Sequence, residues 1–302
     1  MKERGGSGHP GDRLVERYRI TSGEGFRLHD HDPGDVGGLA DHAQAEAWLA
    51  KDVARLSALQ ELLYAQHSWS LLCVFQAIDA AGKDGTIKHV MSGVNPQGVH
   101  VKAFKAPGPE ELDHDFLWRV MRELPERGRI GIFNRSHYEE VLVARVHPEV
   151  LARQHLPESL TTDTIWRHRL KDIAAFERYL ARQGTVILKF FLHISRDEQR
   201  RRFFARMDDA EKHWKFDPGD IAERARWDDY MAAYEAAIRA TATARAPWFV
   251  VPADHKWFAR LVVVRAMIVA LEALQLAPPA LSPEQRQRLV EARRRLAEET
   301  ER

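Results

Sequence analysis

A short apolar run followed by a glycine-containing loop is the feature that most constrains the fold of this chain. Residues 70–78 read SLLCVFQAI and lead directly into DAAGKDGT and a helical stretch. A strand that is buried on both faces has such a continuous apolar sequence, and parallel sheets contain strands of this kind. We therefore predict that residues 70–78 form the central strand of a parallel sheet, with the loop at its carboxyl end.

The same alternation of strand and helix recurs along the chain. Further apolar runs occupy residues 99–104, 129–134, 185–194 and 247–253. Helical periodicity or composition predicts helices over residues 41–66, 110–123, 138–146, 162–183, 196–216, 218–241 and 254–275. This order predicts an α/β fold with a doubly wound, mostly parallel sheet of about five strands flanked by helices.

The two ends of the chain differ from the segment between them. Residues 1–40 are rich in Gly, His and Asp and have little periodicity, so we predict an irregular N-terminal arm. Within it, the run from His29 to Asp32 (HDHD) could bind a metal, but its glycine-rich surroundings favour a flexible leader. Residues 41–275 would form the main domain, and residues 276–302 a charged helical tail.

Composition narrows the possible partners. Lys and Arg number 45 against 44 for Asp and Glu, so a net charge of +1 gives the whole molecule no field that would attract nucleic acid or a membrane. The single cysteine, Cys73, cannot form an intrachain disulfide and lies in an apolar run, which predicts an inert core residue. We find neither a secretion signal nor a membrane span, and we expect a cytoplasmic protein.

The loop after the first predicted strand has the spacing of a phosphate-binding loop. Residues 77–83 fit GxxxxGK if Ala77 replaces the first glycine, although Asp84 stands where a Mg²⁺-binding Ser or Thr is usual. Backbone N–H groups at a helix N-terminus, together with a lysine, bind anions. An ordinary strand-to-helix turn with a left-handed Gly82 is the alternative. The candidate phosphate-binding residues are Ala80, Ala81, Gly82, Lys83, Asp84, Gly85 and Thr86.

Two further segments carry charged side chains that could reach a ligand. The strand over residues 129–134 ends in NRSHYEE (residues 134–140), and ligands bind at the carboxyl ends of strands in open α/β sheets. A surface ion pair between Arg135 and Glu139 is the alternative. In the predicted helix 196–216, Arg202 and Arg206 are one turn apart and could reach the same anion, unless this helix is only a solvated charged surface.

Four aromatic residues follow these arginines. Trp214, Trp227, Tyr230 and Tyr234 are more typical of a core than of a surface on which bases stack. Trp214, near the arginine-rich segment, is the best candidate for the second role.

Taken together, these segments resemble the polyphosphate kinase 2 family, P-loop kinases that transfer a phosphoryl group between inorganic polyphosphate and a nucleotide. The resemblance covers roughly residues 59–252. In the family's order, the chain contains DAAGKDGTIKHVMSGVNPQGV, FKAP, ELDHDFLWR, IGIFNRSHYEEVLV, FER, LKFFLHISRDEQ and WKFDPGD. Several motifs in order are far more specific than one loop pattern, and the family tolerates Asp at the position of Asp84.

The resemblance implies a P-loop kinase-like fold with a helical lid at about residues 196–217. Asp79 and Lys83 match the family's Walker A aspartate and lysine, Arg135 matches its strand-end arginine, and Arg202 and Arg206 look like its lid arginines. Glu139 resembles the acidic residue of the subgroup that accepts both nucleoside mono- and diphosphates. The implied catalytic residues are Asp79, Lys83, Arg135, Glu139, Arg202 and Arg206, and the implied Mg²⁺ ligands are Asp79, Glu139 and Glu140.

The implied function is a polyphosphate-dependent nucleotide kinase that forms ADP from AMP and ATP from ADP with Mg²⁺. Its partners would be inorganic polyphosphate and the nucleotides AMP, ADP and ATP, and we further expect a homo-oligomer. One alternative is an ATP-dependent nucleotide or small-molecule kinase, which would need a second nucleotide pocket. Another is a non-catalytic module that binds anions or RNA, favoured if Ala77 and Asp84 were damage to the loop.

Overall fold

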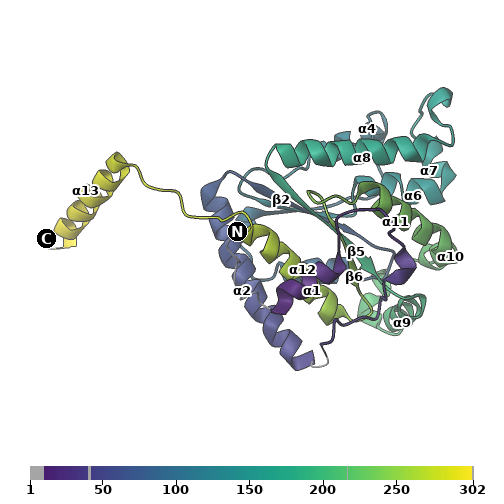
Figure 1. Cartoon of the computed structure of the whole chain (residues 1–302), viewed down its shortest axis with the longest axis horizontal. Helices are drawn as coiled ribbons and strands as arrows, with labels where there is room; N and C mark the ends of the chain where they lie inside the picture. Colours follow the sequence, from purple (N-terminus) through teal and green to yellow (C-terminus); the bar gives the residue numbers. More distant parts are fainter. Residues whose placement is uncertain (1–9, 40–41, 216, 301–302) are drawn as a thin grey trace, which may run out of the picture.

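A six-stranded sheet in the order β1-β6-β5-β2-β4-β3 forms the centre of the computed structural model, which describes residues 10–39, 42–215 and 217–300 (Figure 1). Strands β2 to β6 run parallel to one another, and β1 at the edge is antiparallel to β6. They are β2 (Ser70–Gln76), β3 (Val99–Ala103), β4 (Ile130–Asn134), β5 (Thr185–His193) and β6 (Trp248–Pro252). The predicted α/β class and the five predicted strands are confirmed.

Helices cover both faces of the sheet (Figure 1). One layer contains α1 (Pro10–Tyr18), α2 (His42–Gln66), α3 (Lys83–Val90) and α12 (Lys256–Glu272). The other contains α6 (Val143–Val146), α8 (Ile165–Arg182) and α11 (Trp227–Thr241). Because helices lie on both faces, every residue of β2 is buried, and this is why its sequence is apolar almost throughout.

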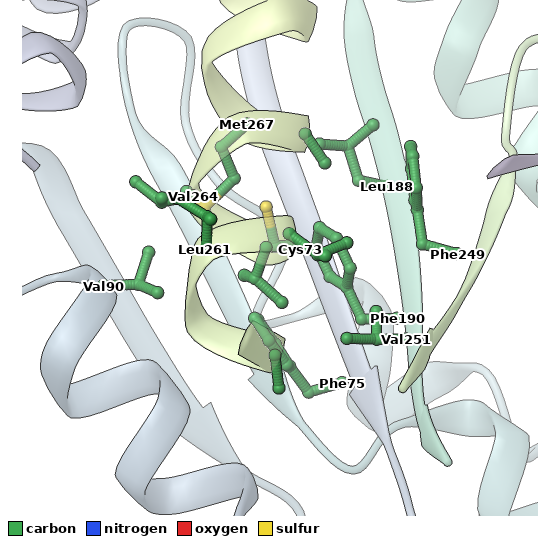
Figure 2. Close-up of a cluster of buried hydrophobic side chains, with 14 of the residues drawn as sticks. Cys73, Phe75, Val90, Leu188, Phe190, Phe249, Val251, Leu261, Val264 and Met267 are labelled. Atoms are coloured by element: carbon green, nitrogen blue, oxygen red, sulfur yellow. The ribbon is translucent and has the colours of Figure 1, made fainter. Parts of the chain in front are cut away.

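Close-packed apolar side chains fill the layer between the sheet and α12 (Figure 2). Phe190 of β5 lies between Phe75 of β2 and Phe249 of β6, with ring centroids 4.9 and 5.3 Å apart. Cys73 faces the same layer, and its burial raises the pKa of the thiol. Cys73 is therefore a core residue, as predicted.

Strands β2 and β4 are neighbours whose following helices leave toward opposite faces of the sheet. The register places Phe75 of β2 beside Asn134 of β4. The helix after β2, α3, packs against α12, whereas α6, which follows β4, packs against α11. Such a switch opens a crevice at the carboxyl ends of the two strands. The two strand-end motifs singled out in the sequence therefore meet at one crevice.

Several predicted helices are broken. Residues 110–123 form α4 (Pro109–Leu112) and α5 (Trp118–Met121). Between these helices the Asp115 carboxylate accepts a hydrogen bond from the backbone N–H of Leu117 (2.9 Å), a local bond that competes with helix formation. Likewise, η3 (His137–Glu140) precedes α6, and α10 (Gly219–Ala225) precedes α11. The remaining elements are α7 (Pro148–Ala152), η2 (Pro96–Gly98), η4 (Glu158–Leu160), α9 (Arg196–Met207) and η5 (Ala210–Lys215).

The N-terminal segment differs from the predicted irregular arm over residues 10–39. It forms α1, the short strand β1 (Arg19–Ile20) and η1 (Leu28–Asp30). Leu14, Val15 and Tyr18 of α1 are buried against the main domain, and β1 pairs with β6 in antiparallel orientation. These apolar residues have helical spacing, but they are few, and the glycines and charged residues around them obscure the helical periodicity of the segment. The predicted arm at residues 1–9 lies outside the described residues.

The C-terminal segment forms the predicted charged helix, α13 (Pro283–Thr300), which extends away from the sheet and its covering helices (Figure 1). Its apolar residues Leu289, Val290 and Leu296 are exposed. Within the described part of the chain, no helix is long and apolar enough to cross a membrane.

A fully buried polar cluster lies between the sheet and α8. Lys189 of β5 is 0% exposed and donates hydrogen bonds to the Glu177 carboxylate and, at 2.8 Å, to the Thr241 carbonyl oxygen. The Tyr138 hydroxyl donates to Glu177 at 2.7 Å. Burial alone would raise the pKa of Glu177, but the Lys189 ammonium holds it below its usual value. Tyr138 belongs to η3, so the cluster anchors the loop that follows β4.

We expect Lys189→Met to lower the free energy of unfolding by about 3–5 kcal/mol, because it leaves the Glu177 carboxylate buried without its cation. Urea denaturation monitored by circular dichroism measures this loss. Adding Glu177→Leu should recover part of it, since the double variant buries no lone charge. Lys102→Met, which removes a partly exposed pair with Glu123, is the control and should cost no more than about 1 kcal/mol. A double variant that is no more stable than Lys189→Met would contradict this account.

Candidate active site

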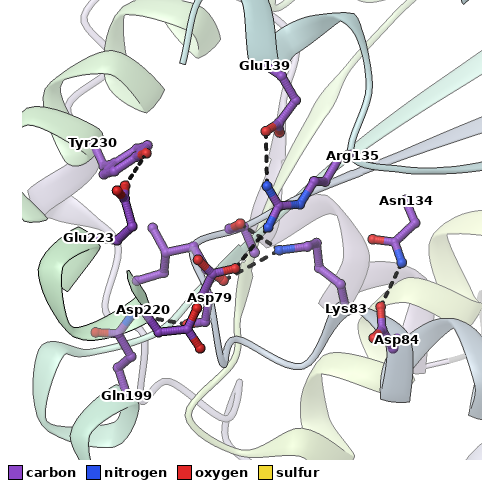
Figure 3. Close-up of polar contacts among 12 residues, drawn as sticks. Asp79, Lys83, Asp84, Asn134, Arg135, Glu139, Gln199, Asp220, Glu223 and Tyr230 are labelled. Atoms are coloured by element: carbon purple, nitrogen blue, oxygen red, sulfur yellow. Dashed lines mark hydrogen bonds and ion pairs between the residues drawn. The ribbon is translucent and has the colours of Figure 1, made fainter. Parts of the chain in front are cut away.

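A groove of about 620 Å³ lies at the carboxyl ends of β2 and β4. The loop between β2 and α3 contributes residues 79–85 to its lining. Asn134 and Arg135 line it from the end of β4, and Arg202 and Arg206 line it from α9. The three segments that the sequence singled out are thus brought together (Figure 3).

The loop after β2 has the backbone of an anion-binding turn. Gly82 has φ 97° and caps the N-terminus of α3, so the free N–H groups of the first helical turn open at the loop. The left-handed Gly82 expected for an ordinary turn is therefore present, but within a loop that lines a groove. Six of the predicted phosphate-binding residues, residues 80–85, line this groove. The seventh, Thr86, is buried behind the loop.

Lys83 starts α3 and is almost fully buried. Its ammonium donates a hydrogen bond to the Ala77 carbonyl oxygen at 2.7 Å, which holds it at the end of β2. Burial lowers the pKa of Lys83, and the cation of Arg135 lowers it further, whereas Asp79 and Glu139 oppose this shift. The lysine therefore stands among charges of both signs at the floor of the groove.

Arg135 joins the two strand-end motifs. Its guanidinium contacts the Asp79 carboxylate at 2.9 Å and the Glu139 carboxylate at 3.3 Å (Figure 3). The ion pair with Glu139 exists, as the alternative interpretation expects, but it is half of a chain that also includes Asp79. Glu139 is the main cause of the raised pKa of Arg135. Arg135 also has a positive φ of 63°, which is uncommon for a residue other than glycine.

Asn134 provides a second link between the end of β4 and the segment that follows β2. Its amide donates a hydrogen bond to the Asp84 carboxylate at 2.6 Å, so the end of β4 is tied to the first turn of α3 (Figure 3). Asn134 is the first residue of the strand-end motif, but no role for it was predicted from the sequence. The strand register, which sequence periodicity cannot supply, is what places it beside α3.

The two arginines of α9 lie in different surroundings. Arg206 lines the groove and contacts the Asp220 carboxylate of α10 at 3.0 Å. Arg202 is only 8% exposed, and its guanidinium donates to backbone carbonyl oxygens of the loop and of the segment after β6. Both arginines line the groove, but their partners differ, and the expectation that both reach one anion stays a prediction. Along one turn of α9, one arginine is buried against backbone carbonyl groups and the next lies beside a carboxylate of the groove.

Glu140 also differs from its predicted place. Its carboxylate accepts hydrogen bonds from Gln154 and from Arg169 of α8, and Glu140 lines two smaller cavities but not the groove itself. In a 3₁₀-helix such as η3, successive side chains point about 120° apart. Glu139 therefore reaches Arg135 while Glu140 turns to Arg169. As a result, Glu140 is not brought together with Asp79.

A second cavity of about 190 Å³ adjoins the groove at Arg135, and Glu139 lines this second cavity. It shares Phe104, Lys105 and Arg135 with the groove, and its further lining is largely apolar, including Pro107, Val143 and Val150. Phe104 and Lys105 come from the FKAP motif, which was part of the family resemblance but carried no assigned role. Asp220, the last residue of the WKFDPGD motif, and Lys256 also line the groove, and neither had an assigned role.

Three of the four aromatic residues noted in the sequence pack within the protein, and the fourth, Trp214, is exposed. Tyr234 is buried and stacks on Phe191 at 4.2 Å, Tyr230 donates to the Glu223 carboxylate, and Trp227 packs against the core. Trp214 of η5 is 79% exposed and lines the groove. Only Trp214 among these four is therefore placed to meet a bound ligand in the groove.

The oxygen donors of the site suit a divalent cation that is shared with a ligand. Among the residues that the structure describes, no group of three or more His, Cys, Asp or Glu is arranged to hold a metal, and this includes the HDHD run of residues 29–32. Asp79 and Glu139 nevertheless offer two carboxylates, both in contact with Arg135. Mg²⁺ is held in kinases by one or two carboxylates together with water and substrate phosphates, so this donor set fits it.

Known proteins match this chain over most of its length. The model of the family described as Polyphosphate kinase 2 matches residues 39–278. A protein of Rhodopseudomonas palustris named ADP-polyphosphate phosphotransferase is 51% identical over 249 residues, which are 82% of this chain and 86% of that protein. A protein of Meiothermus ruber named AMP/ADP-polyphosphate phosphotransferase is 47% identical over 267 residues, 88% of this chain and 96% of that protein.

A solved structure agrees with these relatives. The crystal structure of polyphosphate kinase 2 from Arthrobacter aurescens TC1 superposes with a TM-score of 0.83 at 44% sequence identity, covering 92% of this chain and 96% of that one. The family match spans strands β2 to β6, the loop after β2, the end of β4 and α9, and it therefore includes the elements that build the groove. The chain therefore belongs to the polyphosphate kinase 2 family.

Proposed function

We propose that this protein transfers a phosphoryl group from inorganic polyphosphate to AMP and to ADP. The observation that carries the proposal is that two cavities of different character meet at Arg135. A chain of phosphates suits the open groove, whose lining contains backbone N–H groups and cations. A nucleoside suits the smaller cavity with its largely apolar walls. The names of the R. palustris and M. ruber relatives support these two substrates.

The proposed reaction makes one bond and breaks another. An oxygen of the acceptor's terminal phosphate forms a bond to the terminal phosphorus of the polymer, and the bond from that phosphorus to the bridging oxygen breaks. The shortened polymer leaves with the electron pair of that bond. Such transfers need positioning and charge stabilisation more than covalent chemistry from the protein.

Each candidate residue has a task in this scheme. Lys83 and the loop N–H groups would hold the terminal phosphates of the polymer, and Arg206 would contact them from α9. Arg135, between the two cavities, would hold the phosphoryl group in transit. In doing so, Arg135 exchanges part of its contact with Asp79 and Glu139 for contact with phosphate. The freed carboxylates would hold Mg²⁺, which when bound neutralises charge on the phosphates.

The two alternative functions make different demands. An ATP-dependent kinase would place ATP at the loop and would be inactive with polyphosphate as donor. A non-catalytic anion-binding module would make no product at all. The expected homo-oligomer and cytoplasmic location stay predictions.

We expect the purified protein to convert AMP to ADP, and then ADP to ATP, when polyphosphate and Mg²⁺ are supplied and no ATP is added. Chromatography of AMP, ADP and ATP over time measures both transfers. Removal of Mg²⁺ with a chelator should stop them. Absence of any product would overturn the proposed function, and formation of ADP without ATP, even when ADP is supplied, would restrict the acceptor to AMP.

Asp79→Asn should lower the rate of transfer by about 100-fold or more, because it removes a charge placed to organise Mg²⁺ and Arg135. Asp79 is 33% exposed at its side chain, so the melting temperature should change little. Initial rates at saturating Mg²⁺ and a thermal melt measure the two effects. Asp208→Asn, an exposed carboxylate just after α9, is the matched control. Near-normal activity of Asp79→Asn would refute the role assigned to this carboxylate.

Arg206→Ala should raise the KM for polyphosphate by about tenfold, since one charge-assisted contact is lost. Higher salt should weaken wild-type binding of polyphosphate in the same direction. The measurement is the initial rate against polyphosphate concentration at two ionic strengths. Arg200→Ala, an exposed arginine of the same helix, serves as control. An unchanged KM together with a large fall in melting temperature would make Arg206 a structural residue.

A further inference from the structure

One helix holds three consecutive carbonyl groups of the phosphate-binding loop. From α9, the Gln199 amide donates a hydrogen bond to the Asp79 carbonyl oxygen at 3.0 Å (Figure 3). The Arg202 guanidinium donates to the carbonyl oxygens of Ala80 and Ala81, at 3.1 and 2.7 Å. In a trans peptide, each C=O points opposite to the N–H of the next residue. These bonds therefore set the direction of the N–H groups of Ala80 and Gly82, while the Ala81 N–H donates to the Ile78 carbonyl oxygen within the loop at 3.4 Å.

The arginine of this set is completely engaged. Besides the two loop carbonyls, its guanidinium donates to the carbonyl oxygens of Ala253 and Asp254 after β6, and its Nε donates to the Glu198 carboxylate at 2.7 Å. All five N–H groups of Arg202 thus have acceptors within the protein. A planar guanidinium can bridge several acceptors in fixed directions, which a lysine ammonium cannot do. Arg202 therefore ties the loop after β2 to the end of β6, across the intervening strand β5.

The glutamine is also fixed in one orientation. Its Oε1 accepts a hydrogen bond from Arg224 of α10 at 2.9 Å, which leaves its Nε2 directed at the Asp79 carbonyl oxygen. Gln199 is buried, so its amide cannot exchange this partner for bulk water. The contact from α9 to the loop is thereby held by a second helix.

The loop backbone needs such support. Ala80 has a φ of 62°, a left-handed conformation that is sterically costly for a residue with a Cβ atom. Strained conformations of this kind persist where the surroundings hold them. The Ala80 carbonyl oxygen is one of the two loop acceptors of Arg202, so the strained residue is also a held one.

We propose that Gln199 and Arg202 are positioning residues that hold the loop open for phosphate before substrate binds, and that Arg202 acts through the loop instead of touching phosphate itself. The nature of the ligand, a polyphosphate chain, rests on the proposed function. Arg202 would then position the loop instead of contacting phosphate, as was expected of a lid arginine. Gln199, for which the sequence predicted no role, would position the loop as well. Because Arg206 lies on the same helix, the bonds of Gln199 and Arg202 to the loop also fix the position of Arg206 relative to the loop.

The test compares Gln199→Met and Arg202→Lys with the control Arg201→Lys, whose side chain is 72% exposed on the same helix. Both positioning variants should raise the KM for polyphosphate by about five- to tenfold and leave the KM for AMP within about twofold of wild type. Because Arg202→Lys keeps the charge, a phosphate-contacting role would leave its KM nearer to wild type than that of Gln199→Met. Thermal melts establish that each variant is folded. If Arg202→Lys does not fold, Gln199→Met decides, since it removes only one loop contact.

A binding measurement separates this inference from the proposed function. Calorimetry with inorganic tripolyphosphate and Mg²⁺, without nucleotide, should show weaker binding to the two variants than to wild type and the control. Unchanged binding, or an equal rise in the KM values for polyphosphate and AMP, would overturn the positioning role. A wild-type protein that binds tripolyphosphate but makes no ADP would instead refute the proposed function and leave the positioning role supported by the binding data.

Discussion

The buried ion pair of Lys189 and Glu177 is the constraint on which the geometry of the site depends. A charge in the middle of a sheet is stable only when its partners satisfy it fully, and here Tyr138 and Thr241 complete the cluster. Tyr138 immediately precedes Glu139, so the requirement to satisfy a buried charge also places the loop that carries the site. On the opposite face, the strands pack against α12 mainly through apolar side chains, and the buried ion pair of that layer, between Arg265 of α12 and Asp52, joins two helices.

Charge in the site is balanced locally. Arg135 lies between two carboxylates, and Arg206 lies against Asp220, so cations and anions alternate across the groove. Each pair holds its arginine in place and keeps the net charge of the chain near zero. A polyanion then binds by exchanging partners with cations that are already in place. Burial raises the pKa of Asp220, and the Asp79 carboxylate adds to this effect.

The strands and their order along the chain could be predicted because the signal is local. The continuous apolar sequence of residues 70–78 by itself indicates a buried strand. The spacing of residues in the loop from Asp79 to Gly85 by itself indicates a phosphate-binding loop. Family motifs added the identities of Lys83 and Arg135, which the structure brings to one groove. Most of the candidate site was therefore visible in the sequence as segments, but not as contacts.

What could not be predicted depends on direction. Glu139 and Glu140 are adjacent in sequence, yet a 3₁₀ turn sends them to different partners. Arg202 and Arg206 share a helical face, yet that face runs from the interior to the groove, so burial differs along it. The helix over residues 10–18 escaped prediction because its few apolar positions depend on a surface of α12 that only the folded chain provides.

The short strand β1 has a consequence for the integrity of the sheet. It pairs with β6 through Arg19 and Ile20 and thereby covers part of an edge whose sequence, WFVV, is rich in residues that favour strands. An open apolar edge of this kind is a template for pairing between molecules. By pairing with β6, β1 makes part of this edge inaccessible to a strand of another molecule. A fragment that begins at residue 26 would lose this cover, although every residue of the groove would still be present.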